Sequence, residues 1–246
     1  MSRLHRSAEV GFAGSPGAYE RGRPEYPPEA VRYFVELLGP GAAVLDLAAG
    51  TGKLTRPLVA AGLEVTAVEP VAEMRAALPP QVPALDGTAE AIPLGDAAVD
   101  AVTVAQAFHW FDGQAALREI ARVLRPDGLL ALFWNRRVDE DDVNRAIEAL
   151  VGPHRGDAPA HRSGAWRAAL EHTTAFEPLE ERVFDNAQEL DADGLEARVG
   201  SISFISALDA SERAPVLERA RALAGGGTVR VPYRTEVQTW RRASAP

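Results

Sequence analysis

Short apolar runs alternate with amphipathic segments through the first half of the chain. Apolar residues recur at helical spacing in four segments, which predicts helices at 29–38, 53–61, 71–78 and 113–124. A further apolar run leads into a glycine-rich turn at 44–52. Strands are predicted at 63–70, 98–108 and 129–135, and a short strand and turn at 83–89. This alternation is typical of an α/β fold, a parallel sheet with helices on both faces.

The rhythm changes after Asn135. Helical patterns then cover 139–152, 165–171, 189–207 and 211–224, and strand-like pieces remain at 180–186 and 228–240. Because the later helices interrupt the sheet pattern, we expect them to form a lid over the carboxyl edge of the sheet. The predicted division is an arm at 1–28, a core at 29–138, a lid and substrate region at 139–227 with a sheet strand near 180–186, and a last strand and tail at 228–246.

Composition and charge exclude several classes of function and partner. The chain has 246 residues and no cysteine, which excludes disulfides, thiolate-bound metals and thiol nucleophiles. A net charge of −9 would repel a polyanion, so we expect no nucleic-acid partner. The first residues lack the pattern of a secretion signal, and no apolar run reaches the length of a bilayer span. We therefore expect a soluble, cytoplasmic protein that does not act at a membrane.

The glycine-rich turn reads V-L-D-L-A-A-G-T-G over 44–52. Glycines between a parallel strand and a helix let a ligand approach the backbone closely. Glu69 lies 17 residues beyond Gly52, at the end of the next predicted strand, where an acid can accept both hydroxyls of a ribose. The spacing predicts a nucleoside-containing ligand at the first crevice of the sheet.

The chemistry of the turn distinguishes between nucleoside ligands. A dinucleotide-binding turn would read G-x-G-x-x-G, with helix amides facing a pyrophosphate. Here Asp46 at the strand end would oppose a pyrophosphate and suit a cation. S-adenosylmethionine, which has an adenosine, a sulfonium and an ammonium but no phosphate, fits this pattern. Two alternatives stay open: a dehydrogenase-like protein that binds NAD, and a non-catalytic S-adenosylmethionine-binding protein.

The chain resembles class I S-adenosylmethionine-dependent methyltransferases, in the group with a type 11 methyltransferase domain. The resemblance rests on YERGRPEYP (19–27), VLDLAAGTGKLTRPL (44–58), VTAVEP (65–70), GTAEAIPL (87–94), VDAVTVAQAFHWFD (99–112), REIARVLRPDGLLALFWN (118–135) and VPYRTEVQTW (231–240). It implies a Rossmann-like, mostly parallel sheet of seven strands, whose last strand, here 228–240, is antiparallel.

The resemblance also implies a site for S-adenosylmethionine. The residues at the matching positions are Tyr19, Arg23, Asp46, Ala48, Gly50, Gly52, Glu69, Pro70, Met74, Thr88, Ala89, Glu90 and Gln106. The sequence departs from the family pattern at two of them, since the family usually has glycine at Ala48 and often has aspartate at Thr88. We expect the Ala48 methyl group to be tolerated if its backbone angles stay negative. With threonine at position 88, adenine recognition would depend on the backbone and on Glu90.

His109 is the candidate catalytic residue. Its imidazole would suit a general base that removes a proton from a hydroxyl acceptor, and the alternative is a structural histidine in a loop. A carboxylate acceptor would need no base, because it is already ionised. We expect Tyr26, His109 and Trp110 to line the acceptor pocket. Other aromatic residues could belong to the pocket or to the core, namely Tyr33, Trp134, Trp166 and Phe204, and either Ser203 or Ser206 could face the pocket from the lid.

No metal site is predicted. The acids at 139–142 come directly before a predicted helix, whose positive end explains them. The spacing of His154, His161 and His172 matches no zinc pattern. The strand that precedes His109 also lacks the Asn/Asp-Pro-Pro-Tyr motif of enzymes that methylate a base. The predicted function is methyl transfer from S-adenosylmethionine to a small-molecule acceptor, at oxygen or a carboxylate.

Overall fold

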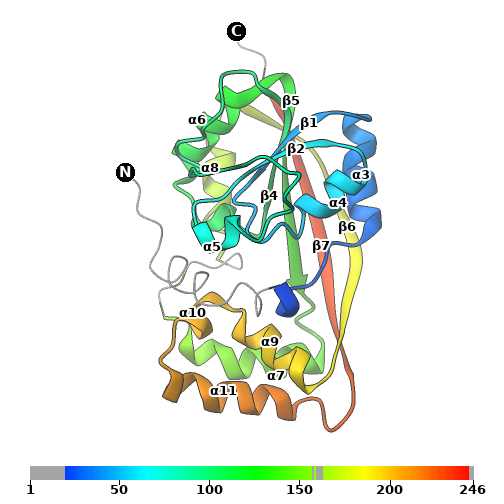
Figure 1. Ribbon diagram of the computed structural model, residues 1–246, viewed down its shortest axis with the longest axis vertical. Coiled ribbons are helices and arrows are strands. Elements are labelled where there is room, and N and C mark those ends of the chain that lie inside the picture. Colours follow the sequence, from blue (N-terminus) through cyan, green and yellow to red (C-terminus); the bar gives the residue numbers. More distant parts are fainter. Residues whose placement is uncertain (1–19, 157, 159–162, 244–246) are drawn as a thin grey trace.

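One twisted sheet organises the molecule. The computed structural model describes residues 20–156, 158 and 163–243, and within them seven strands form a sheet of order β3-β2-β1-β4-β5-β7-β6 (Figure 1). The strands are β1 (Ala43–Leu47), β2 (Glu64–Val68), β3 (Ala84–Leu85), β4 (Val99–Ala105), β5 (Leu124–Arg137), β6 (Phe176–Leu190) and β7 (Val229–Arg242). The first five pair in parallel, and β7 is antiparallel to both β5 and β6. The predicted fold class, including the antiparallel last strand, is confirmed.

Alternation along the strands builds a core on each face of the sheet. On β1, Val44 packs on one face while Leu45 and Leu47 pack on the other. Helices α3 (Pro28–Leu38) and α4 (Thr55–Ala60) cover the first face, and α6 (Gly113–Val123) and α8 (Arg167–Glu171) cover the second (Figure 1). The parallel strands of the sheet are therefore covered on both sides, as a parallel sheet requires.

Prolines account for the bounds of two predicted helices. Pro57 lies in the first turn of α4, the part of a helix that tolerates a missing amide. The helix predicted at 71–78 is shorter, because α5 spans only Ala72–Arg75 and Pro79-Pro80 follow closely. The strand predicted at 83–89 is only the two residues of β3.

The lid lies beyond the carboxyl ends of the parallel strands (Figure 1). It contains α7 (Asp142–Val151), η2 (Gly152–His154), α9 (Ala192–Gly200), α10 (Ser203–Ser206) and α11 (Ala210–Ala222). These elements share a buried cluster of their own, which includes Ile147, Val199 and Val216. The helical pattern expected around 189–207 is divided into two helices, because β6 continues to Leu190, Asp191 caps α9 through the amide of Gly194 at 2.8 Å, and α10 is separate.

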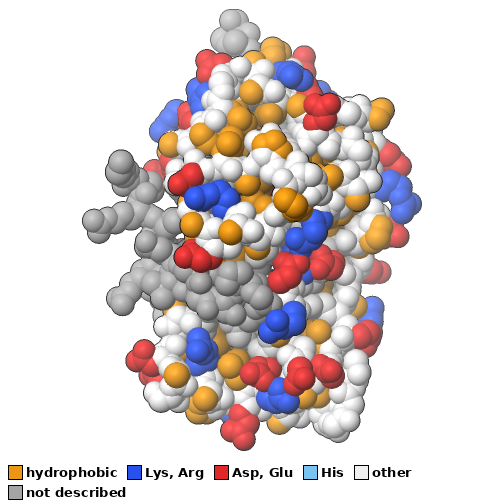
Figure 2. Space-filling view, viewed as in Figure 1, with side chains coloured by type: hydrophobic (Ala, Val, Ile, Leu, Met, Phe, Trp, Pro, Cys, Tyr) orange, Lys and Arg blue, Asp and Glu red, His pale blue; other side chains and the backbone are white. Residues whose placement is uncertain are grey.

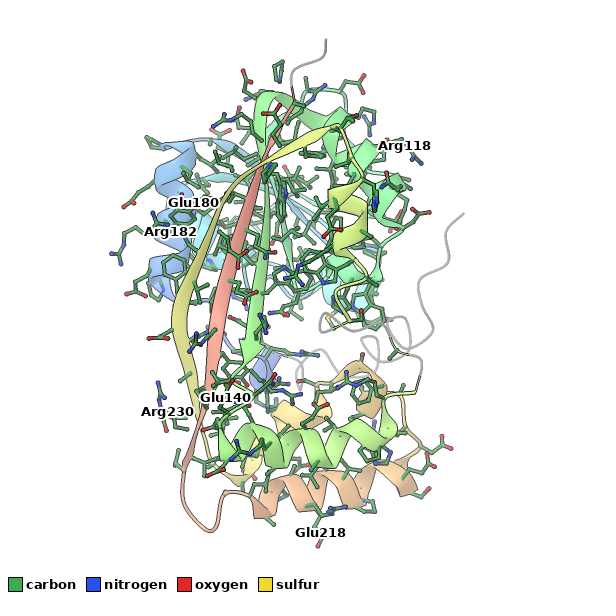
Figure 3. All side chains as sticks on the ribbon, turned by 180° about the vertical axis from the view of Figure 1, so that it is seen from behind. Arg118, Glu140, Glu180, Arg182, Glu218 and Arg230 are labelled. Atoms are coloured by element: carbon green, nitrogen blue, oxygen red, sulfur yellow. The ribbon has the colours of Figure 1, made fainter. Side chains whose placement is uncertain are left out.

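Two long strands join the lid to the core. β6 extends well beyond the predicted 180–186 and pairs with β7 from Phe176 to Leu190. Figure 3 shows both strands running from the sheet into the lid, with Glu180 and Arg182 toward the core and Arg230 near the lid. Within the described ranges, no helix is both long and apolar enough to cross a membrane.

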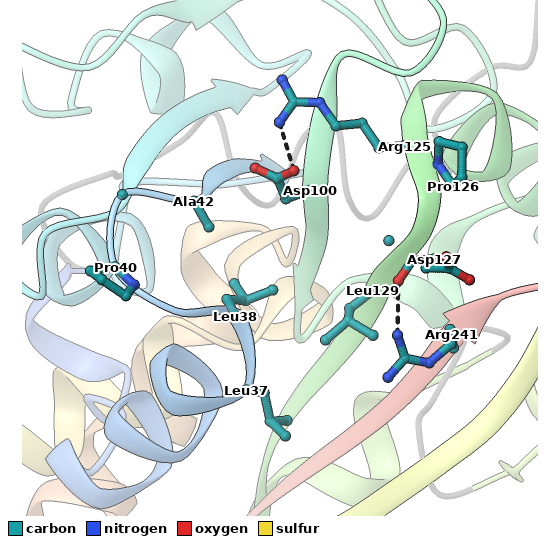
Figure 4. A pocket seen from close by; sticks show the side chains of 12 residues that line it. Leu37, Leu38, Pro40, Ala42, Asp100, Arg125, Pro126, Asp127, Leu129 and Arg241 are labelled. Atoms are coloured by element: carbon teal, nitrogen blue, oxygen red, sulfur yellow. Dashed lines mark hydrogen bonds and ion pairs between the residues drawn. The ribbon is translucent and has the colours of Figure 1, made fainter.

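A cavity of about 430 Å³ lies at the opposite edge of the sheet, beside the amino ends of β1 and β4 (Figure 4). Three of its charged side chains already have partners inside the protein. Asp100 pairs with Arg125 at 2.6 Å, and Arg241 donates to the carbonyl of Asp127 at 3.2 Å. The glycine-rich turn is at the other edge, so this cavity contributes nothing to the site described below.

Candidate functional site

The glycine-rich loop after β1 turns through left-handed backbone conformations. The φ angles of Ala48, Gly50 and Gly52 are 57°, 58° and 89°. A Cβ added at Gly50 would meet no atom within 4 Å, whereas one at Gly52 would lie 3.0 Å from the Leu78 side chain. Gly50 therefore leaves its side of the loop open to a ligand, and Gly52 allows the loop to pack closely.

Ala48 does not meet the condition under which its methyl group was expected to be tolerated. Its φ is positive, a conformation that costs an L-residue about 1–2 kcal/mol. Gln106, directly after β4, has the same φ of 57°, and its backbone amide donates to the carbonyl of Phe133 at 2.9 Å. Ala48 and Gln106 thus hold strained backbone at the carboxyl ends of two neighbouring strands, a pattern associated with functional sites.

Glu69 lies directly beside the loop. Its side chain is buried, and its two carboxylate oxygens accept from the amides of Gly50 and Val71, each at 2.9 Å. Burial raises the pKa of Glu69, although these two bonds and the charge of Arg75 act against the rise. Each oxygen keeps a second lone pair that can accept a ligand hydroxyl. The structure therefore brings the predicted ribose acid to the predicted glycine loop.

Asp46 lies beneath the loop and is fully buried. Its carboxylate accepts from the hydroxyls of Thr55 at 2.6 Å and Thr103 at 3.0 Å. Burial raises its pKa to about 6, against the effect of the two hydroxyls. Because the side chain is enclosed, Asp46 can influence a bound cation through its charge and not through contact. Thr55 stands where a dinucleotide-binding turn has its third glycine.

The residues predicted around the adenine lie on two segments next to the loop. Pro70 is half-buried, and Met74 on α5 is buried, so the end of β2 offers an apolar surface. Ala89 is buried in the core on the α6 side. Thr88 forms an isolated bridge with Ala91, which shapes the turn between β3 and β4.

Glu90 is tied to another element. Its carboxylate accepts from the amide of Asp112 at 3.0 Å, and Asp112 in turn caps α6 through the amide of Ala115 at 3.1 Å. Glu90 therefore fixes the turn against α6 in addition to its predicted contact with the adenine. Tyr19, predicted to reach the cofactor, lies outside the described residues.

The arm is fastened across the glycine loop. Glu20 accepts from the hydroxyl of Thr51 and pairs with Arg56, and Lys53 pairs with Glu25. Figure 2 shows acidic and basic side chains side by side where the core meets the lid. This contact was not predicted, although Glu20 and Glu25 lie inside the arm motif at 19–27 that carries the resemblance.

The arm also contacts the lid and the far strands. Arg23 donates from Nη2 to the carbonyl of Ser201 at 2.8 Å. Asn186 on β6 donates to the carbonyl of Glu25 at 2.8 Å, and Asn135 at the end of β5 donates to the same carbonyl at 3.2 Å. Residues 20–27 therefore connect the loop, the sheet and the lid.

A small cavity of about 30 Å³ lies between the arm, the strand ends and the lid. It is lined by Arg23, Pro24, Tyr26, Lys53, Gln106, Asn135 and Arg198. Three predicted site residues line it. Gln106 and Arg23 were predicted to bind the cofactor, and Tyr26 was predicted to line the acceptor pocket. Lys53, Asn135 and Arg198 were missed, since an asparagine after a strand is a weak signal and Arg198 lies in a helical pattern without a motif.

His109 and Trp110 are not among the residues that line that cavity. They lie on η1 (Phe108–Trp110), and His109 is three residues after Gln106. The His109 ring is 5.0 Å from the ring of Trp110 and 5.6 Å from that of Trp134. Trp134 is fully buried and stacks near Trp166, with centroids 5.0 Å apart. The role of His109 as a base stays a prediction.

The other aromatic and hydroxyl candidates occupy different places. Tyr33 donates to Glu180 at 3.0 Å and lies beside Phe184 of β6, away from the loop. Phe204 on α10 lies under the guanidinium of Arg155. Ser203 is buried within the lid, whereas Ser206 is half-buried.

The acids and histidines weighed as metal ligands have structural surroundings. Asp141 caps α7 through the amide of Asn144 at 2.9 Å, and Asp142 pairs with Arg145. His172 donates from Nδ1 to the carbonyl of Ala168 at 2.6 Å. His154 lies in η2, and His161 is outside the described residues. In the part of the chain that the structure describes, no three potential ligands come together.

These observations fit S-adenosylmethionine better than a dinucleotide. The loop is open at Gly50, and Glu69 can accept ribose hydroxyls beside it. Two carboxylates, Asp46 and Glu69, lie close enough for the charge of Asp46 to raise the pKa of Glu69. Such a pair would repel a pyrophosphate and is compatible with a sulfonium cation.

Comparison with known proteins agrees with this chemistry. Residues 45–132 match a family model described as a methyltransferase domain. An uncharacterized methyltransferase from Mycobacterium tuberculosis is 52% identical over 158 residues, and the match spans 62% of this chain and 63% of that relative, less than two thirds of its length.

Two further proteins match over more of their length. An uncharacterized methyltransferase-like protein from Schizosaccharomyces pombe is 37% identical over 204 residues, which cover 80% of this chain and 79% of that protein. A solved structure from Anaeromyxobacter dehalogenans, whose name describes a type II methyltransferase, is 25% identical and superposes with a TM-score of 0.67. The match covers 89% of this chain and 97% of that structure. The chain therefore belongs to the class I S-adenosylmethionine-dependent methyltransferases.

Proposed function

We propose that this protein transfers a methyl group from S-adenosylmethionine to a small-molecule acceptor, at an oxygen or a carboxylate. The observation that carries the proposal is the cavity at the carboxyl ends of β4 and β5, between the arm and α9, which is lined by no acid among the described residues. It adjoins the strand end at Gln106, where the predicted cofactor site begins. An acceptor held there would be shielded from water by the arm and the lid.

The cofactor would be held by the loop and the ends of the strands. Glu69 would accept the ribose hydroxyls beside Gly50, and Met74 would offer an apolar surface to the adenine. Gln106 and Arg23 would hold the methionine end. When bound, S-adenosylmethionine supplies a methyl group that is activated for transfer by its sulfonium.

The protein's own contribution would be orientation, exclusion of water and, for some acceptors, removal of a proton. A hydroxyl acceptor needs a base, and His109 on η1 would serve, since it follows the end of β4 closely. A carboxylate acceptor needs none, and His109 would then have a packing role beside Trp110 and Trp134. The net charge of −9 supports a small molecule over a nucleic acid as the acceptor.

Transfer of a labelled methyl group tests this proposal. The protein is incubated with S-adenosylmethionine labelled in its methyl group, together with either a dialysable small-molecule extract or the macromolecules retained on dialysis. We expect label in the small-molecule products, and at least tenfold less with Glu69→Gln at limiting cofactor. Label in RNA or protein alone would overturn the proposed acceptor class while leaving the methyltransferase family assignment in place.

A further inference from the structure

Arg198 is a buried cation held in a fixed position. It lies on the inner side of α9 with 6% of its surface exposed. Its Nε donates to the hydroxyl of Tyr233 at 2.8 Å, and that hydroxyl donates to Oε1 of Gln188 at 2.8 Å. Nη1 of Arg198 is buried and has no hydrogen-bond partner among the described residues. A buried polar atom of a charged group without a partner is costly, so this arrangement calls for an explanation.

Among the described residues, Arg198 forms no ion pair. Burial and the charge of Arg198 together lower the pKa of Arg137 to about 10, which shows that the two guanidinium groups lie close together. The acid in this region, Glu148, already accepts from Arg137 and from Arg155. Nη1 of Arg137 is also buried without a described partner. The inner side of the lid therefore carries excess positive charge in a protein of net charge −9.

The small cavity between the arm, the strand ends and the lid lies where the positive charge of Arg198 could bind an anionic group. Arg198, Arg23 and Lys53 line it, together with polar and aromatic groups, and none of the described residues that line it is acidic. Lys53 is already paired with Glu25, so the charge available to a ligand comes from the arginines. Its volume of about 30 Å³ is near the share of one water in the liquid, so it suits the head group of a ligand. A planar carboxylate matches the fork of a guanidinium, and it is smaller than a phosphate or sulfate group, which a cavity of about 30 Å³ favours.

We propose that Arg198 binds a carboxylate of the methyl acceptor in this cavity, an inference that rests on the proposed function. S-adenosylmethionine carries a carboxylate too, but the elements that hold Arg198 favour the acceptor. Arg198 is fixed by β6, β7 and the lid, whereas the residues beside the glycine loop come from β1 and β2. Tyr233 acts as a positioning residue, because its hydroxyl orients the guanidinium.

The test compares variants on two separate readouts. A small-molecule extract is split on an anion exchanger, and the retained and unretained fractions are each offered as acceptors with methyl-labelled S-adenosylmethionine. Affinity for S-adenosylhomocysteine is measured by calorimetry on the same proteins. The variants are Arg198→Gln, Arg198→Lys, Tyr233→Phe and, as a matched control, Arg221→Gln, which removes a surface arginine that pairs with Asp193 and Glu196 on the outside of the lid.

We expect label from the retained fraction, with or without prior phosphatase treatment. Arg198→Gln should raise the apparent KM for that fraction about 10- to 100-fold, the effect of losing a hydrogen bond to a charged group. Its affinity for S-adenosylhomocysteine should stay within twofold of the wild type. Arg198→Lys should recover part of the loss, Tyr233→Phe should have a smaller effect, and Arg221→Gln should behave as wild type.

Several results would overturn the inference, and each is distinct. Label from the unretained fraction alone, or loss of label after phosphatase treatment, would mean that the acceptor's recognised group is not a carboxylate. Weaker binding of S-adenosylhomocysteine by Arg198→Gln would assign the arginine to the cofactor, and an unchanged KM would remove it from acceptor binding. Absence of transfer from both fractions by the wild type would count against the proposed function itself.

Thermal unfolding distinguishes a binding role from a structural one. Replacing a buried cation that has no counter-charge in the described part of the chain with an apolar side chain of similar length should not destabilise the ligand-free protein. Arg198→Met should therefore show an equal or higher Tm, although it loses acceptor binding. A clearly lower Tm would mean that Arg198 serves to hold the lid together.

Discussion

The two carboxylates at the glycine loop, Glu69 and Asp46, lie in different environments, and we expect each to control a different property of the protein. Glu69 meets the loop amide of Gly50 and keeps lone pairs for a ligand, while Asp46 is enclosed by Thr55 and Thr103. Glu69 is thus expected to control cofactor affinity. Asp46 is expected to control how the stability of the protein depends on pH.

Glu69→Gln should weaken binding of S-adenosylhomocysteine by about 1.5–3 kcal/mol, roughly 10- to 100-fold, because it removes the charged acceptor of the ribose hydroxyls. Calorimetric titration measures the change. Glu73→Gln, on the exposed side of α5 four residues further on, is the control and should bind as wild type. Unchanged affinity in Glu69→Gln would remove the ribose assignment.

Asp46→Asn should make the protein more stable at pH 8 by about 1–3 kcal/mol. Burial raises the pKa of Asp46 from 3.8 to about 6, so the folded protein holds this proton more tightly than the unfolded chain does. Stability from protonated Asp46 is therefore complete below about pH 4 and is lost as pH rises through about 6. Urea unfolding of both proteins from pH 4 to pH 8 should show their difference growing with pH.

Asp100→Asn is the contrasting control for this measurement. Burial would raise the pKa of Asp100, but the amide of Ala43 and the charge of Arg125 outweigh it and the pKa is lowered. Its contribution to stability is present above its unfolded pKa and is lost as pH falls. Asp100→Asn should therefore be less stable than wild type at pH 8. If both variants shifted stability in the same direction, the environment assigned to Asp46 would be wrong.

At the scale of elements, the arm is the connection that the local sequence pattern could not show. Its residues 20–27 contact the glycine loop, α9, β5 and β6 through side chains far apart in the sequence. Gly22 lies so close to α9 that an added Cβ would be 2.1 Å from the carbonyl oxygen of Ala197. Only glycine allows this approach.

Gly22→Ala should detach the arm from the lid. We expect trypsin to cut after Arg21 about tenfold faster, which corresponds to about 1.4 kcal/mol of lost protection. The control is Gly95→Ala, whose added Cβ would meet no atom within 4 Å. Equal cleavage of wild type and Gly22→Ala would show that the arm does not depend on this contact.

The sequence predicted elements well where the hydrophobic periodicity agreed with capping and turn residues at the ends of the element. The α6 helix was expected at 113–124 and spans Gly113–Val123, because its apolar face and the cap at Asp112 both mark it. β6 was underestimated because Glu, Asp and Asn recur along it, and its pairing with β7 overrides the weak local preference. Asn135 and Arg198 in the cavity could not be found because their meeting depends on how the lid lies against the sheet.

At the scale of the whole molecule, core and lid are joined by continuous strands. β5 and β7 pair from Leu129 to Arg137, and β6 and β7 continue into the lid cluster. We therefore expect a single cooperative unfolding transition. The four tryptophans lie on the core side, so their fluorescence reports the core, whereas far-UV circular dichroism also reports the lid helices.

Ile147→Ala tests this coupling from inside the lid. Ile147 is fully buried, and its truncation should lower the unfolding free energy by about 2–5 kcal/mol. Fluorescence and circular dichroism should still give one coincident transition, shifted equally. Val183→Ala, half exposed on β6, is the control and should change stability by less than about 0.5 kcal/mol. A lid transition that separates from the tryptophan signal would mean that the two parts unfold independently.

The most direct test of the account is a calorimetric titration of the wild-type protein with S-adenosylhomocysteine, with NAD as the comparison ligand. The open loop at Gly50, the acceptor oxygens of Glu69 and the two carboxylates beneath the loop predict binding of S-adenosylhomocysteine and no binding of NAD. Binding of NAD alone would contradict the assignment of this loop to a sulfonium cofactor and leave only the fold in place.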